Sequence, residues 1–118
     1  MTLLVYGIPN CSTCKKALTW LEENNVNYQF INTKEHPPSK NSIENWVKSL
    51  GIKSMRNTSG LSYRALGEEK NTWTQEQWID AFAQDAMLLK RPLFVKNNQG
   101  VLVGFRANET VKKELLCN

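Results

Sequence analysis

The chain has 118 residues, 41% of them hydrophobic, which favours one folded domain over residues 1–118 and excludes a disordered chain. No apolar stretch is long enough to cross a bilayer and no basic-then-hydrophobic leader is present, so we expect no membrane association and a cytoplasmic location. The net charge of +4 comes from 15 basic and 11 acidic residues, mostly scattered, which predicts no direct nucleic-acid binding but permits a local anion pocket.

The first part of the chain predicts a strand, a helix and a second strand. Leu3 to Tyr6 is a continuous apolar run, typical of a strand covered on both faces. After a turn over residues 7–10, Ser12 or Thr13 is expected to cap a helix that ends at Asn24-Asn25. Its apolar residues recur at helical spacing, and residues 26, 28 and 30 then alternate as a strand. A helix of about a dozen residues between two strands predicts a parallel βαβ unit.

A helical insert is predicted over about residues 39–88. Ser39 or Ser42 opens a helix with one apolar stripe, and Gly51 ends it. Residues 53–72 are polar and are expected to be irregular, with a short helical turn near residues 63–66. Residues 74–77 fit a capping box, and the helix they start is expected to carry apolar residues inward, namely Trp78, Ile79, Phe82, Ala83 and Ala86.

The last part of the chain predicts a β-hairpin and a helix. Residues 93–96 and 101–105 form the two strands around the turn Asn97-Asn98-Gln99-Gly100, and a helix then starts near Asn108. The order βαβ, helical insert, ββα predicts an α/β protein with a thioredoxin-like (glutaredoxin-like) fold. Its four-stranded mixed sheet should carry helices on its faces.

Cys11 and Cys14 form a C-x-x-C pattern at the start of the first helix. A helix N-terminus favours the thiolate, and Lys15 and Lys16 would add to this effect, so Cys11 suits nucleophilic attack. Cys14, about one turn further on, is within disulfide reach and could resolve a mixed disulfide. Two alternatives stay open, a pair of inert buried cysteines and a zinc site completed by His36 and Cys117. The spacing favours both less, so we expect no metal, and Cys117 is expected to be a free thiol.

Four segments together resemble the arsenate reductase (ArsC) family, including its Spx branch. They are "PNCSTCKKALTWLEENNVNYQFIN", "NTSGLSYRALG", "MLLKRPLFV" and "VGFR", in order along nearly the whole chain. Pro92 directly precedes the third predicted strand, where thioredoxin-like sites carry a cis X–Pro bond packed against the cysteine loop. The resemblance implies the same thioredoxin-like fold with a helical insert.

The resemblance also implies roles for individual residues. Cys11 matches the cysteine that attacks arsenate, and Arg64, Arg91 and Arg106 match arginines that surround the oxyanion, whereas Arg56 matches none and is expected at the surface. In the family's mechanism glutathione attacks the thiolate–arsenate adduct, and glutaredoxin releases the resulting mixed disulfide. Glutathione is therefore the expected co-substrate, and no bound cofactor is expected. Glutaredoxin or thioredoxin is the expected electron donor. The protein is expected to be a monomer.

Two departures from the arsenate-reducing members shape the functional hypotheses. Those members carry a histidine shortly before the cysteine, where this chain has Gly7-Ile8, and they lack a cysteine at the position of Cys14. The first hypothesis is a thiol-dependent oxidoreductase that acts on a small oxyanion or a disulfide through Cys11, with Cys14 or glutathione resolving. The alternative is an Spx-like redox sensor that binds RNA polymerase and regulates transcription.

Overall fold

The computed structural model describes residues 2–106 and 108–116. The elements in chain order are β1 (Leu3–Gly7), α1 (Ser12–Glu23), β2 (Tyr28–Asn32), α2 (Lys40–Leu50), α3 (Ile52–Met55), α4 (Leu61–Ala65), the 3₁₀ helix η1 (Glu68–Thr72), α5 (Gln75–Gln84), the 3₁₀ helix η2 (Ala86–Leu88), β3 (Leu93–Lys96), β4 (Gln99–Val103) and α6 (Glu109–Leu116). Across this part of the chain, no helix combines the length and apolar character needed to span a membrane.

The four strands form one mixed sheet in the order β2-β1-β3-β4. β1 pairs with β2 in parallel, whereas β1 with β3 and β3 with β4 are antiparallel. Val5 at the centre of β1 therefore lies between Phe30 of β2 and Phe94 of β3. The predicted mixed sheet and its parallel βαβ unit are confirmed, because the helix α1 joins the two strands that pair in parallel.

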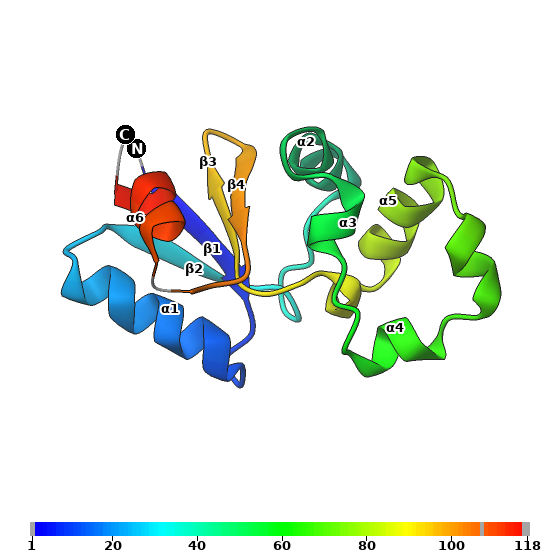
Figure 1. Cartoon of the computed structure of the whole chain (residues 1–118), viewed down its shortest axis with the longest axis horizontal. Helices are drawn as coiled ribbons and strands as arrows, with labels where there is room; N and C mark the ends of the chain where they lie inside the picture. Colours follow the sequence, from blue (N-terminus) through cyan, green and yellow to red (C-terminus); the bar gives the residue numbers. More distant parts are fainter. Residues whose placement is uncertain (1, 107, 117–118) are drawn as a thin grey trace.

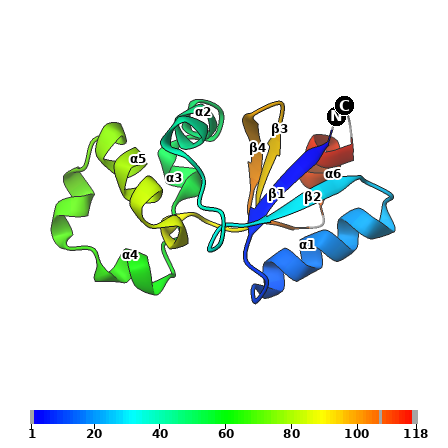
Figure 2. The same cartoon turned by 180° about the vertical axis from the view of Figure 1, so that it is seen from behind.

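The alternation of side chains along the strands divides the interior into two cores. One face of the sheet packs against α1 and α6, and its buried residues are Leu3, Val5, Ala17, Leu21, Phe94, Val111 and Leu115. The other face packs against the insert, whose buried residues include Ile43, Trp46, Val47, Met55, Trp78, Ile79 and Phe82, together with Leu93 and Val95 of the sheet. Figures 1 and 2 show the two layers, with α1 and α6 on one side of the strands and α2 to α5 on the other.

The ends of the two long insert helices follow the sequence signals. The Ser39 side chain caps α2, and Gly51 ends it with a φ of 84°, a left-handed value that glycine adopts without steric cost. The predicted capping box of α5 is present, since the Thr74 hydroxyl accepts from the Gln77 backbone and the Gln77 side chain accepts from the Thr74 N–H. Both helices therefore begin at the residues that the sequence indicates.

Three expectations for the connecting segments are corrected. The stretch over residues 53–72 is more regular than expected. The short helical turn predicted near residues 63–66 is present as α4, but η1 and most of α3 also lie in the stretch, and its apolar side chains pack against the insert core. The hairpin turn is shorter than expected, since Asn97 and Asn98 alone form it with φ values of 52° and 63° and β4 already starts at Gln99. Arg56 does not lie free at the surface, because its guanidinium stacks 5.1 Å from the centre of the Trp78 ring.

Candidate functional site

Cys11 lies at the junction between the β1 turn and α1. It has extended backbone angles, and its sulfur accepts a hydrogen bond from the Cys14 N–H at 3.4 Å, so Cys11 itself is the N-cap of the helix. The expectation that Ser12 or Thr13 would cap α1 is wrong, because the helix begins one residue earlier and Ser12 is its first helical residue. The nucleophile predicted from the sequence therefore also satisfies a backbone donor of the first turn.

Cys14 lies one turn along α1 with its side chain buried against the sheet, only 1% exposed. Its sulfur fills the space beside Gly7, where a side-chain carbon on that glycine would approach Cys14 Sγ to 2.6 Å. The Gly7 carbonyl is in turn held by Thr33, whose backbone N–H donates at 2.9 Å and whose hydroxyl donates at 3.4 Å. The end of β1 is thus shaped to accommodate the second cysteine.

The pKa values of the two thiols are shifted in opposite directions. Burial raises the pKa of the Cys11 thiol, but hydrogen bonds from the side chain and backbone of Cys14, the charge of Arg91 and the Thr13 backbone together lower it below its ordinary value. The pKa of Cys14 is raised to about 11, mainly by burial and to a smaller extent by its hydrogen bond to Cys11. Cys11 is accordingly the thiolate-forming member of the pair, and Cys14 is its proton-bearing neighbour.

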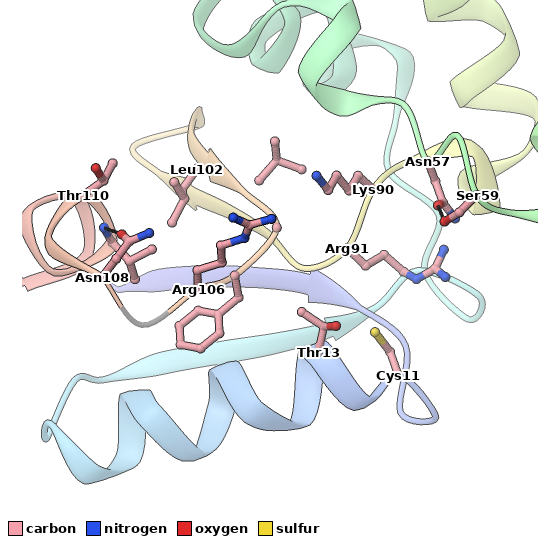
Figure 3. A pocket seen from close by; sticks show the side chains of 14 residues that line it. Cys11, Thr13, Asn57, Ser59, Lys90, Arg91, Leu102, Arg106, Asn108 and Thr110 are labelled. Carbon is pink, nitrogen blue, oxygen red and sulfur yellow. Dashed lines mark hydrogen bonds between the residues drawn. The ribbon is translucent and has the colours of Figure 1, made fainter.

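Arg91 provides the positive charge that acts on Cys11, whereas Lys15 and Lys16, which were expected to do so, are not among the causes of the shift. The Arg91 guanidinium is half-buried, and it donates to the Leu89 carbonyl at 3.5 Å and to the Met87 sulfur at 3.9 Å. The peptide bond between Arg91 and Pro92 is cis. Figure 3 shows the Arg91 guanidinium between Cys11 on one side and Asn57 and Ser59 on the other.

A cavity of about 560 Å³ opens next to Cys11 between the insert and the sheet layer. Its polar and charged lining consists of Cys11, Thr13, Asn57, Ser59, Lys90, Arg91, Arg106, Asn108 and Thr110, and its apolar wall of Leu102, Val103, Phe105 and Val111, with Gly104 between them. Among the described residues, three cations and no acidic side chain line it, so the cavity attracts anions. Its volume falls in the range of sites for small organic ligands, about 300–1,000 Å³.

The structure brings together some of the predicted site residues and leaves others outside. Cys11, Thr13, Arg91 and Arg106 line the cavity, and Cys14 lies beneath Cys11. Arg64 is not among the lining residues; its guanidinium donates to the Ser59 carbonyl at 2.9 Å.

Lys15 and Ser12 are exposed, and Pro92 is buried. Lys15 instead borders a shallow hollow along α1 with Lys16, Trp20 and Phe105. Cys117 lies outside the described residues, and within them no three histidine, cysteine or acidic side chains gather as metal ligands would. The direct roles of these residues in binding or catalysis stay predictions.

Sequence reasoning did not identify Asn57, Ser59 and Lys90 as site residues. The first two belong to the segment "NTSG", which the family resemblance used only as a marker, and Lys90 precedes Arg91 in "KRP". Asn57 and Ser59 come to the cavity through contacts between distant parts of the chain, because the Asn57 N–H donates to the Leu88 carbonyl at 2.8 Å. An Asn-Thr-Ser-Gly turn between two helices was the available signal.

We compared the chain with known protein families and solved structures. Residues 6–113 match the ArsC family. The chain belongs to the ArsC family. A crystal structure described as a possible arsenate reductase from Streptococcus mutans UA159 superposes with a TM-score of 0.83, at 38% identity over 92% of this chain and 94% of that one. The thioredoxin-like fold of the family, expected from the element order, is thereby confirmed.

Two curated relatives illustrate the range within the ArsC family. An uncharacterized protein of Bacillus subtilis strain 168, YusI, is 35% identical over 113 residues, which cover 92% of this chain and 95% of YusI. The global transcriptional regulator Spx of Lactiplantibacillus plantarum is 24% identical over 109 residues, covering 91% of this chain and 82% of Spx. The expected membership of a family that contains both reductases and Spx is confirmed.

Proposed function

We propose that this ArsC-family chain is a thiol-dependent reductase in which Cys11 attacks the substrate and Cys14 resolves the adduct. The observation that carries the proposal is the pair of thiols at the start of α1, one with a lowered pKa and facing a cavity lined by three cations. A thiolate is the nucleophilic form of cysteine, and fixed guanidinium groups stabilise negative charge that develops on the attacked group.

The proposed steps balance in electrons and protons. With a disulfide substrate, the Cys11 thiolate forms a mixed disulfide and expels one thiolate of the substrate, which takes a proton from water. Cys14 then loses its proton to water and attacks the Cys11 sulfur, which forms the Cys11–Cys14 disulfide and releases the second thiolate. With arsenate, the Cys11 thiolate forms an S–As bond and displaces one hydroxyl group, which leaves as water. Cys14 then attacks the Cys11 sulfur, the S–As bond breaks with its electron pair on arsenic, and As(III) departs as arsenite while the two thiols become a disulfide. Glutathione with glutaredoxin, or thioredoxin, returns two electrons and restores both thiols.

The raised pKa of Cys14 slows the step in which Cys14 resolves the mixed disulfide on Cys11. A thiol with a pKa of about 11 is almost fully protonated near neutral pH, so resolution requires the proton to leave a buried site. Glutathione from the cytoplasm, the proposed location, competes for the same mixed disulfide. We therefore expect Cys14→Ser to keep activity that depends on glutathione, whereas Cys11→Ser abolishes turnover.

The first experiment is NADPH consumption in the presence of glutathione, glutathione reductase and glutaredoxin, with either arsenate or a glutathione-linked disulfide as substrate. The expected result is turnover of at least one substrate that disappears in Cys11→Ser and persists in Cys14→Ser. Equal turnover in wild type and Cys11→Ser would show that Cys11 is not the nucleophile.

The relationship to Spx supports a second candidate, a redox-sensing transcriptional regulator that binds RNA polymerase. The C-x-x-C pair, with one reactive and one buried thiol, could act as a switch without a small-molecule substrate. Absence of turnover, together with ready oxidation of Cys11 and Cys14 and capture of RNA polymerase by the purified chain, would favour this candidate over the reductase.

A further inference from the structure

The turn over residues 57–60 carries two cavity residues and is held in place by Arg64. The Arg64 Nη2 donates to the Ser59 carbonyl at 2.9 Å, and the Arg64 backbone N–H donates to the Gly60 carbonyl at 3.2 Å. The first bond engages the exposed Arg64 guanidinium with the main chain of the turn. Asn57 and Ser59 of the same turn line the cavity (Figure 3). Arg64 therefore acts on the site through the turn and not through contact with a ligand.

Gly60 leaves room for the Asn57 amide. A side-chain carbon at position 60 would approach Asn57 Nδ2 to 2.7 Å, although the backbone there has an ordinary negative φ of −82°. The Gly60 N–H also donates to the Asn57 carbonyl at 3.4 Å. The backbone at position 60 does not need the conformational freedom of glycine, and the missing side chain leaves the space in which the amide of Asn57 lies.

Both the nitrogen and the oxygen of the Asn57 amide form hydrogen bonds, but the amide keeps further hydrogen-bonding capacity. Its Nδ2 donates to the Met87 carbonyl at 3.4 Å, and its Oδ1 accepts from the Ser59 hydroxyl at 3.2 Å. A carboxamide has two N–H donors and two acceptor lone pairs, so one donor and one acceptor of Asn57 stay available. A peptide group offers the complementary acceptor and donor, and a two-bond pairing with it orients a substrate more strictly than a single charge does.

Asn57 lines the same cavity as Cys11, so a ligand paired with Asn57 lies in the cavity that Cys11 faces. Asn57 and Arg91 both contact Met87, and the Arg91 charge acts on the Cys11 sulfur. The three cations of the cavity suit the anionic part of a ligand, whereas the turn over residues 57–60 contributes only neutral and directional groups. A cavity of about 560 Å³ also exceeds what a single tetrahedral oxyanion would fill.

We propose that Asn57, presented by a turn that Arg64 positions, binds the peptide group next to the cysteine of a disulfide substrate. The inference rests on the proposed function, because it assigns the substrate class of the same Cys11 site: peptide or protein disulfides. In the step concerned, the Cys11 thiolate forms a bond to one substrate sulfur, the substrate S–S bond breaks, and the departing thiolate takes a proton from water.

The test compares two uncharged disulfides in the Cys14→Ser background, where the mixed disulfide on Cys11 accumulates. One is the disulfide of N-acetylcysteine methylamide, which carries peptide groups beside the sulfur, and the other is bis(2-hydroxyethyl) disulfide, which carries none. Mass spectrometry with peptide mapping follows adduct formation on Cys11 and yields one rate constant for each probe. The readout is the ratio of the two rate constants, which a general loss of folding or reactivity does not change.

We expect Asn57→Ala to lower this ratio about tenfold, the effect of losing one or two hydrogen bonds to the substrate. Arg64→Ala should lower it in the same direction, and Arg64→Lys should restore part of it because lysine can still donate to the Ser59 carbonyl. Thr58→Ala is the matched control, since Thr58 is in the same turn and does not line the cavity, and it should leave the ratio unchanged.

The outcomes separate this inference from the proposed function. If both disulfides modify Cys11 and the ratio is the same in Asn57→Ala as in the parent, the inference is overturned while the proposed function stands. If neither disulfide modifies Cys11, the nucleophilic role of Cys11 toward disulfides fails and this inference fails with it. If Arg64→Ala leaves the ratio unchanged while Asn57→Ala lowers it, the positioning role of Arg64 is overturned.

Discussion

Gly7 and Cys14 compete for one space, and a double-mutant cycle can measure that competition. A methyl group at position 7 would lie 2.6 Å from Cys14 Sγ and 3.3 Å from the Phe30 ring, where ordinary van der Waals contact begins at 3.4 Å. The sulfur cannot move away easily, because Cys14 is 1% exposed and packed between α1 and the end of β1. Gly7→Ala should therefore overpack the core next to the nucleophile.

The structure sets the expected magnitudes. Forcing one methyl group into a packed interior costs about 1–3 kcal/mol, and removing the buried sulfur in Cys14→Ala costs about 1 kcal/mol. In the double variant the methyl group occupies the space that the sulfur leaves, so the free energy of unfolding should be close to that of Cys14→Ala alone. The coupling energy between the two positions should then equal the cost of Gly7→Ala alone, about 1–3 kcal/mol in favour of the double variant.

Urea unfolding of the reduced protein, followed by the fluorescence of buried Trp46 and Trp78, measures these free energies. Gly67→Ala is the matched control, because its added carbon would meet only the flexible end of Glu69, and it should change stability by less than about 0.5 kcal/mol. Wild-type stability of Gly7→Ala, or strict additivity in the double variant, would refute the steric argument. The cycle also bears on function, because a histidine at position 7 could not coexist with the Cys14 sulfur in this arrangement.

Three further predictions concern the site and the insert. Arg91→Met should raise the pKa of Cys11, because it removes the positive charge that favours the thiolate, and the pH midpoint of iodoacetamide alkylation should move upward; an unchanged midpoint would contradict the assigned charge effect. Thr74→Ala removes the capping box of α5 and should lower the free energy of unfolding by about 0.5–2 kcal/mol, measured in urea, whereas Thr72→Ala should have a smaller effect. Phe82→Ala should cost about 3–5 kcal/mol by the same assay, because this ring is fully buried in the insert core, and a cost below about 1 kcal/mol would contradict that packing.

Local signals in the sequence predicted most of the fold. The apolar run at residues 3–6, the cap at Ser39, the stop at Gly51 and the capping box at Thr74 each act within one turn or one strand, and the structure confirms all four. The parallel pairing of β1 with β2 and the hairpin of β3 with β4 were predicted, whereas the structure shows that β1 and β3 join the two halves. The stretch over residues 53–72 was predicted less well, because its short helices depend on packing against α5 and the sheet rather than on their own periodicity.

The candidate site also has one part that the sequence predicts and one part that depends on packing. Cys11 at the start of α1 could be located from the sequence, because the C-x-x-C pattern and the helix start are adjacent along the chain. The resemblance assigned anion binding to Arg64, yet its guanidinium donates to the Ser59 carbonyl and does not line the cavity, whereas Asn57 and Ser59 do. Which side of a short helix faces a cavity depends on how that helix docks, and no pattern within five residues encodes it.

By itself the sequence determined the family, the order of the strands and long helices along the chain and the place of Cys11 at the start of α1, because each depends on residues that are neighbours along the chain. Only the tertiary structure decided the fine chemistry of the site. The pKa of Cys11 is lowered first by hydrogen bonds from its chain neighbour Cys14, but the charge of Arg91, which lies far away along the chain, adds to them. The burial of Cys14 depends on the missing side chain at Gly7. Charge effects and steric exclusion act over a few ångströms in space, so they follow the packing of distant segments and not their spacing in the sequence.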